Sequence, residues 1–190
     1  MDFPANPFWN FSLELYRAPN VAQACLALQE RHGIDVNFLF FCVWLGRTGH
    51  GPYTRNDIAA FADRVAPWHE AVVKPLRAVR RRIKDPVGAE NRDLALAYRQ
   101  RVQKIEIDAE HVEQVTLFEA VAQATPRAQE PAMAADSAAR NVMHYFALLG
   151  RRPTAGDVAD LKLILGAAFA ALTPKQVTVL ADFFFDRAAL

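Results

Sequence analysis

The chain has 190 residues, of which 52% are hydrophobic and 23% are charged; this composition excludes an intrinsically disordered protein and leaves room for one sizeable core. The formal net charge is only +1. The two cysteines, Cys25 and Cys42, belong to no C-x-x-C motif or Cys/His cluster; this argues against a zinc site and favours buried, reduced thiols. Runs of alternating β-branched residues are scarce, whereas Ala, Leu, Arg, Glu and Gln are abundant, so the predicted fold class is all-α.

Two helices are predicted at the start of the chain. Residues 7–17 carry a wide aromatic face, and Pro19 ends this helix because proline disfavours helical geometry in the residue before it. Asn20 is the expected N-cap of the next helix, over 21–31, and Gly33 is the expected left-handed stop after it.

The most apolar stretch of the chain follows directly. From 34 to 45 only Asp35 and Asn37 are polar, and the run is too short to span a bilayer, which needs about 20 residues. Asp35 is expected to cap this helix through the amide of Asn37 or Phe38. We therefore predict a helical bundle in which 34–45 is the buried, innermost helix.

A long helical hairpin is predicted over 54–122. Thr54 and Asp57 form a capping-box pattern, after which one apolar stripe continues for about 30 residues, with a kink or break near Pro67. A turn at 85–88 then leads to a second long helix with a matched stripe. Two such helices joined by a tight turn pack antiparallel.

The rest of the chain divides into a linker and a tail. Residues 124–140 are rich in Ala and Pro and lack large apolar side chains, which predicts a linker that becomes helical after Asp136. The predicted organisation is a main helical domain over 1–123, this linker, and a C-terminal helical extension over 141–190 that docks on the main domain.

The positive charge of the chain is concentrated in one segment. Residues 74–104 contain ten basic side chains against three acidic ones, a local net charge of +7. In an antiparallel hairpin this charge converges at the tip, where it attracts phosphates or acidic groups. The candidate residues for binding an anion or a partner are Arg77, Arg80, Arg81, Lys84, Arg101 and Lys104. The alternative is structural, because cations near a helix C-terminus complement its dipole and ion pairs with Glu90 or Asp93 neutralise part of the charge.

An acidic run lies on the second hairpin helix. Glu106, Glu110 and Glu113 share one face at i, i+4 and i+7, a carboxylate placement that di-iron bundles use. Those bundles also need a Glu-x-x-His motif on two helices, whereas Glu110 and His111 are adjacent here. We therefore predict no metal site and no cofactor, and interpret the run as a solvated face that is open to pairing with the arginine-rich surface of another copy.

A second candidate site surrounds the start of the apolar helix. Buried polar groups need hydrogen-bond partners, and His32 and Trp44 are within plausible range of Asp35 and Asn37. These four residues are the predicted small-molecule pocket, with capping and internal hydrogen bonds as the alternative explanation. The histidines stand in no recognisable pairing with Ser, Cys or Asp, so no catalytic residue is assigned.

Several short motifs resemble a bacterial family of uncharacterised proteins, a domain of unknown function. They are F-W-x-F-S from Phe8, A-C-L-x-L-Q from Ala24, G-x-D-V-N from Gly33 and W-L-G from Trp44. The resemblance extends more loosely through the hairpin, over residues 7–120. It implies no substrate, cofactor or catalytic residue, because the family has no established activity.

The sequence favours a cytoplasmic interaction or adaptor protein over an enzyme, since it contains no catalytic motif, no signal-peptide pattern and no apolar run of membrane-spanning length. The basic tip is expected to meet an acidic protein partner or nucleic acid. Self-association through Trp9 or the aromatic run 183–185 is a further expectation. The alternative is a small-molecule-binding or enzymatic bundle that uses the predicted pocket.

Overall fold

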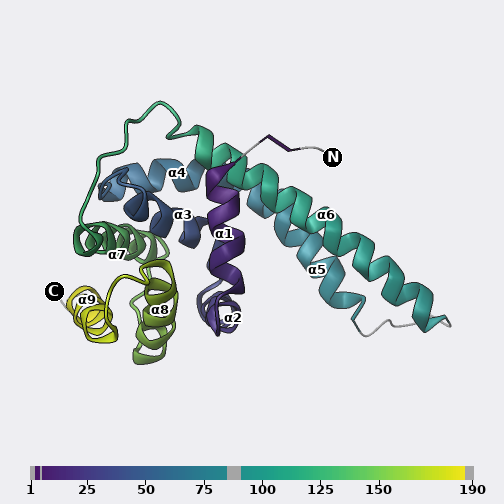
Figure 1. Ribbon diagram of the computed structural model, residues 1–190. Helices are drawn as coiled ribbons and strands as arrows, with labels where there is room; N and C mark the ends of the chain where they lie inside the picture. Colours follow the sequence, from purple (N-terminus) through teal and green to yellow (C-terminus); the bar gives the residue numbers. More distant parts are fainter. Residues whose placement is uncertain (1–2, 5, 85–90, 187–190) are drawn as a thin grey trace.

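The part of the chain that its computed structural model describes is residues 3–4, 6–84 and 91–186, with side chains described as far as Asp182 (Figure 1). In chain order the helices are α1 (Pro7–Arg17), α2 (Val21–His32), α3 (Val36–Arg47), α4 (Arg55–Trp68), the π-helix η1 (His69–Val73), α5 (Lys74–Arg82), α6 (Arg92–Glu119), α7 (Pro131–Leu148), α8 (Ala155–Ala168) and α9 (Pro174–Asp186). These described residues contain no strand, which confirms the all-α fold class. None of the described helices combines the length and the apolar character needed to cross a membrane.

Helix α3 is the innermost element of the bundle, as predicted. Every residue from Asn37 to Gly46 is buried, and α1, α6, α7 and α8 all contact this helix. Gly33 ends α2 in the left-handed region, at φ 68°, and its N–H donates to the Gln29 carbonyl at 2.8 Å. The Asp35 carboxylate accepts the Asn37 N–H at 2.9 Å and so caps α3. Both predicted helix boundaries are therefore confirmed.

Asn20 occupies the N-cap position of α2, as predicted, but its side chain does not cap the helix. Its φ of 64° lies in the left-handed region, and its side chain makes no capping hydrogen bond. Asparagine tolerates this conformation better than most residues that carry a side chain. Asn20 therefore provides the tight turn between α1 and α2 and takes the N-cap position without a side-chain hydrogen bond.

Helix α7 occupies much of the segment that was predicted to be a linker. It begins at Pro131, earlier than the predicted start after Asp136, so 131–140 is helical and is not a linker. Its small side chains are buried where α7 packs on α3, at Ala134, Ala135, Ala138 and Ala139. The lack of bulk that suggested a linker is what allows the two helices to approach closely.

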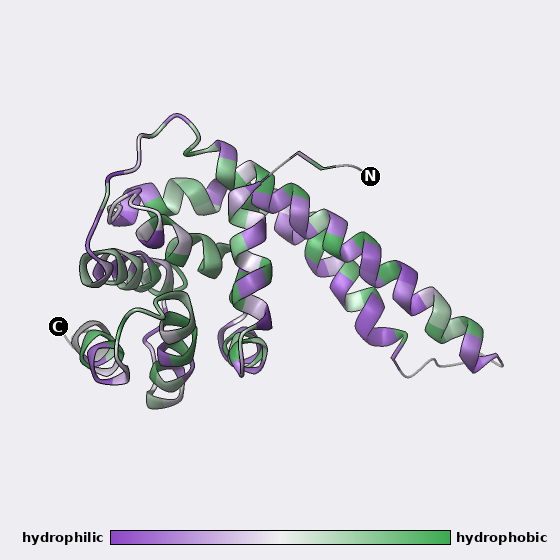
Figure 2. Cartoon of the chain, in the orientation of Figure 1, coloured by the Kyte–Doolittle hydropathy of each residue, from purple (hydrophilic) through white to green (hydrophobic). Residues whose placement is uncertain are grey.

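The predicted hairpin projects from the bundle, with α5 and α6 side by side (Figure 1). The predicted irregularity near Pro67 takes the form of the π-helix η1, which begins two residues later at His69. The predicted turn at 85–88 lies outside the described residues. Hydrophilic and hydrophobic residues are mixed along both α5 and α6 (Figure 2).

A buried carboxylate connects the C-terminal helices to α2. Asp157 accepts a hydrogen bond from Arg31 Nε at 2.7 Å, lies 2.8 Å from His32 Nε2, and forms a capping box with Thr154 at the start of α8. Burial raises the pKa of Asp157, but the hydrogen bonds from Thr154, His32 and Arg31 outweigh that effect and lower the pKa to about 2. The carboxylate therefore stays ionised and holds α8 against α2.

Candidate functional site

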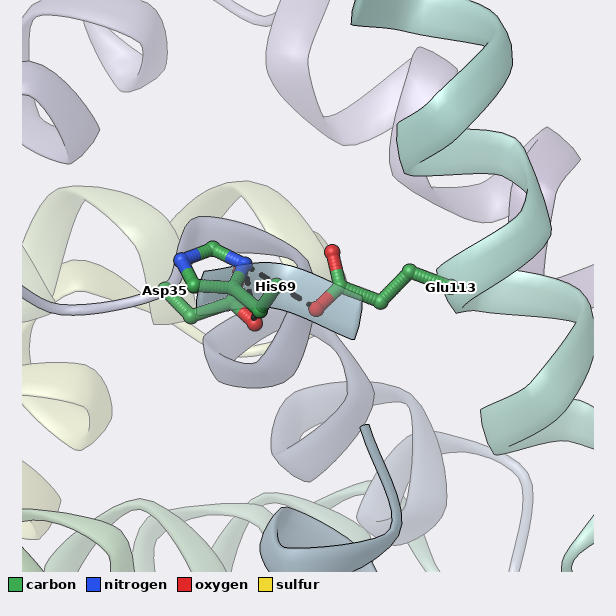
Figure 3. A group of neighbouring side chains, drawn as sticks. All are labelled: Asp35, His69 and Glu113. Atoms are coloured by element: carbon green, nitrogen blue, oxygen red, sulfur yellow. Dashed lines mark hydrogen bonds and ion pairs between the residues drawn. The ribbon is translucent and has the colours of Figure 1, made fainter. Parts of the chain in front are cut away.

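Three ionisable side chains from distant parts of the chain meet inside the bundle (Figure 3). His69 Nδ1 lies 3.0 Å from Glu113 Oε1 and 3.3 Å from Asp35 Oδ2. Asp35, His69 and Glu113 are 8%, 5% and 0% exposed, so the cluster is almost entirely removed from water. Two carboxylates that share one imidazole nitrogen at this depth form a strongly coupled group.

Local chain geometry places each of these side chains. Asp35 is the N-cap of α3, and Glu113 comes from the part of α6 that crosses the bundle. His69 opens the π-helix η1, in which the Lys74 N–H donates to the His69 carbonyl. Pro75 follows directly and has no N–H to donate into the preceding turn, so a wider turn suits the chain here. Single π-helical turns of this kind are frequent at functional sites.

Asn37 and Gln114 hold the cluster in position. The Asn37 backbone N–H donates to Asp35 Oδ1 at 2.9 Å, and Asn37 Nδ2 donates to Glu113 Oε2 at 2.9 Å. Gln114 Nε2 in turn donates to Asn37 Oδ1 at 2.7 Å. Each carboxylate therefore has one oxygen fixed by Asn37 and its other oxygen directed at His69.

The charges of the cluster are coupled. Burial, together with the nearby charge of Glu113, raises the pKa of Asp35 to about 8. Burial acts to lower the pKa of His69, but the hydrogen bond to Glu113 and the charges of Asp35 and Glu113 outweigh it, and the pKa is raised. Asp35 and His69 therefore each hold a proton to a higher pH than they would in water.

A second polar network lies along the hairpin, next to this cluster. Arg77 donates to Glu106 at 3.1 Å and to Glu110 at 2.7 Å, and Arg80 donates to both carboxylate oxygens of Glu106. Glu106 is 3% exposed, and Glu113, one turn beyond Glu110, is fully buried. The prediction that the acidic run is a solvated face is therefore wrong, because this face of α6 packs on α5, η1 and the bundle.

The candidate basic residues divide into two groups. Arg77 and Arg80 form ion pairs within the hairpin, with Glu106 and Glu110. Of the two expected acidic partners, Asp93 forms no ion pair with a described residue, and Glu90 lies outside the described part of the chain. The other four are exposed and have no ion pair with any described residue: Arg81, Lys84, Arg101 and Lys104.

A cavity of about 410 Å³ opens between the hairpin and helices α1, α2 and α3. Asn37 and Gln114 lie in its wall beside the Arg77–Glu110 ion pair, and the lining also includes Trp9, Tyr16, Phe40 and Ile107. Two buried polar atoms of lining residues, Ser12 Oγ and Gln114 Oε1, have no hydrogen-bond partner. Buried polar atoms normally have partners, so two unpartnered atoms in residues of one cavity wall are unusual.

The predicted four-residue pocket is not assembled as one site. Asp35 and Asn37 lie together, but His32 contacts Asp157, and Trp44 packs in the aromatic core at 5.5 Å from Phe8 (ring centroids). Four members of the site were not predicted from the sequence: Ser12, His69, Glu113 and Gln114. The two prolines that flank His69 were visible in the sequence, but nothing there connected this histidine to Asp35 or Glu113.

The residues predicted for self-association also differ in their surroundings. Trp9 stacks on His111 with a centroid distance of 4.0 Å and nearly parallel rings. The side chains of the run 183–185 lie outside the described part of the structure.

The comparisons with known proteins give a family and nothing more specific. A family model described as "Protein of unknown function (DUF2390)" matches residues 7–117, which is more than half of the chain. No curated protein and no solved structure matches the chain. The match begins at the first residue of α1 and ends in α6 beyond Gln114, so it includes every residue of the cluster and of the cavity wall named above. The chain therefore belongs to the DUF2390 family of proteins of unknown function.

Proposed function

We propose that this protein binds a small molecule in the cavity between the hairpin and α1, α2 and α3. The observation that carries the proposal is the pair of unpartnered polar atoms, Ser12 Oγ and Gln114 Oε1, in the lining of that cavity. An unpaired buried polar group costs about 1 to 3 kcal/mol, and a ligand that supplies the missing hydrogen bonds removes that cost. Ser12 can donate or accept, whereas Gln114 Oε1 needs a donor.

The charge of the lining favours an organic anion. Arg77 and Arg80 are balanced by Glu106 and Glu110, whereas the remaining lining guanidiniums, Arg17 and Arg81, are exposed and have no ion pair among the described residues. Guanidinium groups suit carboxylates and phosphates through paired N–H donors. The expected ligand has an apolar body, one hydroxyl or amide donor, and a carboxylate or phosphate at the rim.

The test is ligand binding by the full chain and by two variants with a matched control. The full chain is screened by thermal shift against amphipathic carboxylates and phosphates, and the affinity of each stabilising compound is then measured by calorimetry. Arg81→Ser removes an exposed rim charge, and Ser12→Leu fills the cavity. Arg151→Ser removes an exposed arginine that does not line the cavity and serves as the control.

We expect Arg81→Ser to weaken binding at least tenfold and Arg151→Ser to leave it unchanged. Ser12→Leu should abolish binding; where this variant fails to fold, Ser12→Ala is used, and a measurable loss of affinity is expected. A folded wild-type chain that no compound stabilises counts against the proposal, as does equal affinity in the Arg81→Ser and Arg151→Ser variants.

We also propose, as a second candidate, that the hairpin docks on an acidic protein partner. Leu94, Tyr98 and Ile105 are 67%, 58% and 54% exposed, and they share one stripe of α6 with the unpaired Arg101. Exposed apolar residues beside unpaired cations suit an acidic surface with an apolar centre. Charge reversal at Arg81 and Arg101 should abolish partner capture; capture that survives reversal rejects this surface, and a nuclease-sensitive yield identifies nucleic acid instead.

A further inference from the structure

The cluster of Asp35, His69 and Glu113 has the composition and spacing of a metal site. Its three donor atoms, one imidazole nitrogen and two carboxylate oxygens, all lie within 4.8 Å of one another. From this geometry we infer that Asp35, His69 and Glu113 bind one divalent transition-metal ion.

The distances are those of ligands around a common ion. Donors bound at about 2.1 Å lie about 3.0 Å apart when adjacent in an octahedron and about 3.4 Å apart in a tetrahedron. His69 Nδ1 lies 3.0 Å from the Glu113 oxygen and 3.3 Å from the Asp35 oxygen, within this range. Figure 3 shows one oxygen of each carboxylate in contact with the same ring nitrogen of His69.

Outer contacts fix both carboxylates in the orientation that ligation requires. Asn37 engages one oxygen of Asp35 and one oxygen of Glu113, and Gln114 fixes Asn37, so the second oxygen of each carboxylate faces His69. Hydrogen bonds of this kind orient ligands around a metal and hold their charge in place. Asp35 is the most exposed of the three ligands, with 11% of its side-chain surface accessible to solvent.

The donor set selects the class of ion. Imidazole suits zinc, iron, cobalt and nickel, whereas a site for magnesium or calcium is built from oxygen ligands alone. Ligation requires both carboxylates in their ionised form, so binding of a divalent cation releases the protons that the metal-free cluster holds and balances the two negative charges. Three protein ligands leave at least one position for water, as in catalytic zinc sites.

The metal site is separate from the cavity of the proposed function. Asp35, His69 and Glu113 do not line the cavity, whereas Asn37 and Gln114 stand between the two and belong to its wall. Metal binding and ligand binding can therefore fail independently, and each has its own readout.

The test uses the full chain, stripped of metal with a chelator and then titrated with Zn²⁺, Co²⁺ and Mg²⁺. Stoichiometry is measured by elemental analysis after gel filtration, and the coordination of Co²⁺ by its visible absorption. The variants are His69→Gln and Asn37→Ser, and the control is His144→Gln, which changes a histidine that contacts Tyr53 outside the cluster. Circular dichroism establishes that each variant is folded.

We expect one Zn²⁺ or Co²⁺ per wild-type chain and no retention of Mg²⁺. His69→Gln should lower the affinity at least a hundredfold, Asn37→Ser tenfold to a hundredfold as for other outer contacts of metal ligands, and His144→Gln should have no effect. Where His69→Gln does not fold, the Asn37→Ser result decides. A folded wild-type chain that retains neither Zn²⁺ nor Co²⁺ overturns the inference, as does undiminished binding in the cluster variants.

Discussion

Replacing Gly46 with alanine tests the close packing of α3 on α7. Gly46 lies in the last turn of α3, and a Cβ atom added there would sit 2.3 Å from the Ala138 nitrogen, 2.6 Å from the Ala138 Cα and 2.7 Å from the Ala134 carbonyl oxygen. These are backbone atoms of α7, so no side-chain rotation relieves the contact. The two helices must separate instead.

The size of the effect follows from this geometry. An ordinary contact begins near 3.4 Å, so the backbones must move apart by about 1 Å at this point. Overpacking of a core costs about 1 to 3 kcal/mol, and a rigid backbone contact belongs at the upper end. Alanine offsets part of this loss, because it favours the helix over glycine by up to about 1 kcal/mol. We expect Gly46→Ala to lower the free energy of unfolding by about 2 kcal/mol, which corresponds to about 4 to 8 °C in Tm for a chain of this size.

The assay is urea unfolding followed by circular dichroism, with Gly166→Ala as the matched control. Gly166 also lies near the C-terminal end of its helix, α8, and an added Cβ meets only Val177 Cγ1, at 4.0 Å. Gly166→Ala should therefore leave stability unchanged or raise it by up to about 1 kcal/mol. Equal stabilities for Gly46→Ala and wild type would refute the claim that the glycine is required for the α3–α7 approach.

Two further predictions concern buried ionisable groups. In metal-free protein, the free energy of unfolding should fall as the pH rises from about 5 to about 8. The pKa of Asp35 is raised to about 8 and the pKa of His69 is also raised, so in this range the folded chain holds protons that the unfolded chain has released. A tenfold difference in proton affinity between the folded and the unfolded chain changes the free energy of unfolding by about 1.4 kcal/mol. Urea titrations at several pH values measure this dependence, and an identical pH dependence in Asp35→Asn would contradict the assignment. Asp157→Asn should lower the free energy of unfolding by about 2 kcal/mol. This is less than the loss of about 3 to 5 kcal/mol typical of a fully buried ion pair, because the side chain of its partner Arg31 is 37% exposed. A loss below about 0.5 kcal/mol would show that the Arg31–Asp157 contact does not hold α8 against α2.

Local signals in the sequence predicted most of the helices and their ends. Gly33 and Asp35 mark boundaries by their own backbone and hydrogen-bonding preferences, and the Thr54–Asp57 capping box forms as its spacing predicts. Such features depend on neighbours within a few residues. The start of α7 was misplaced because an alanine-rich stretch is compatible with both a linker and a close helix contact, and only a partner such as Gly46 decides between them.

The candidate site could be predicted only in part because its contacts join distant segments. Asp35 and Asn37 stood out as polar residues in an apolar run, but their partners Glu113 and Gln114 are more than 70 residues away. His69 is aimed inward by a π-helix, and an extra residue in a turn shifts every later position relative to the regular period. Spacing within α6 shows only that Glu106, Glu110 and Glu113 share a face, and it does not show that this face packs on the bundle.

Helix α7 lies outside the residues that match the family model, yet it packs in the core of the bundle. The family match ends at residue 117, before α7 begins, yet α7 covers α3, and its Tyr145 hydroxyl accepts the Asp35 N–H at 2.8 Å. A fragment cut at the end of the match would leave one side of the most apolar helix open to water and would remove the hydrogen bond to the Asp35 backbone. Expression trials and evolutionary comparisons should therefore treat residues 131–148 as belonging to the same cooperative unit, however much their sequence diverges.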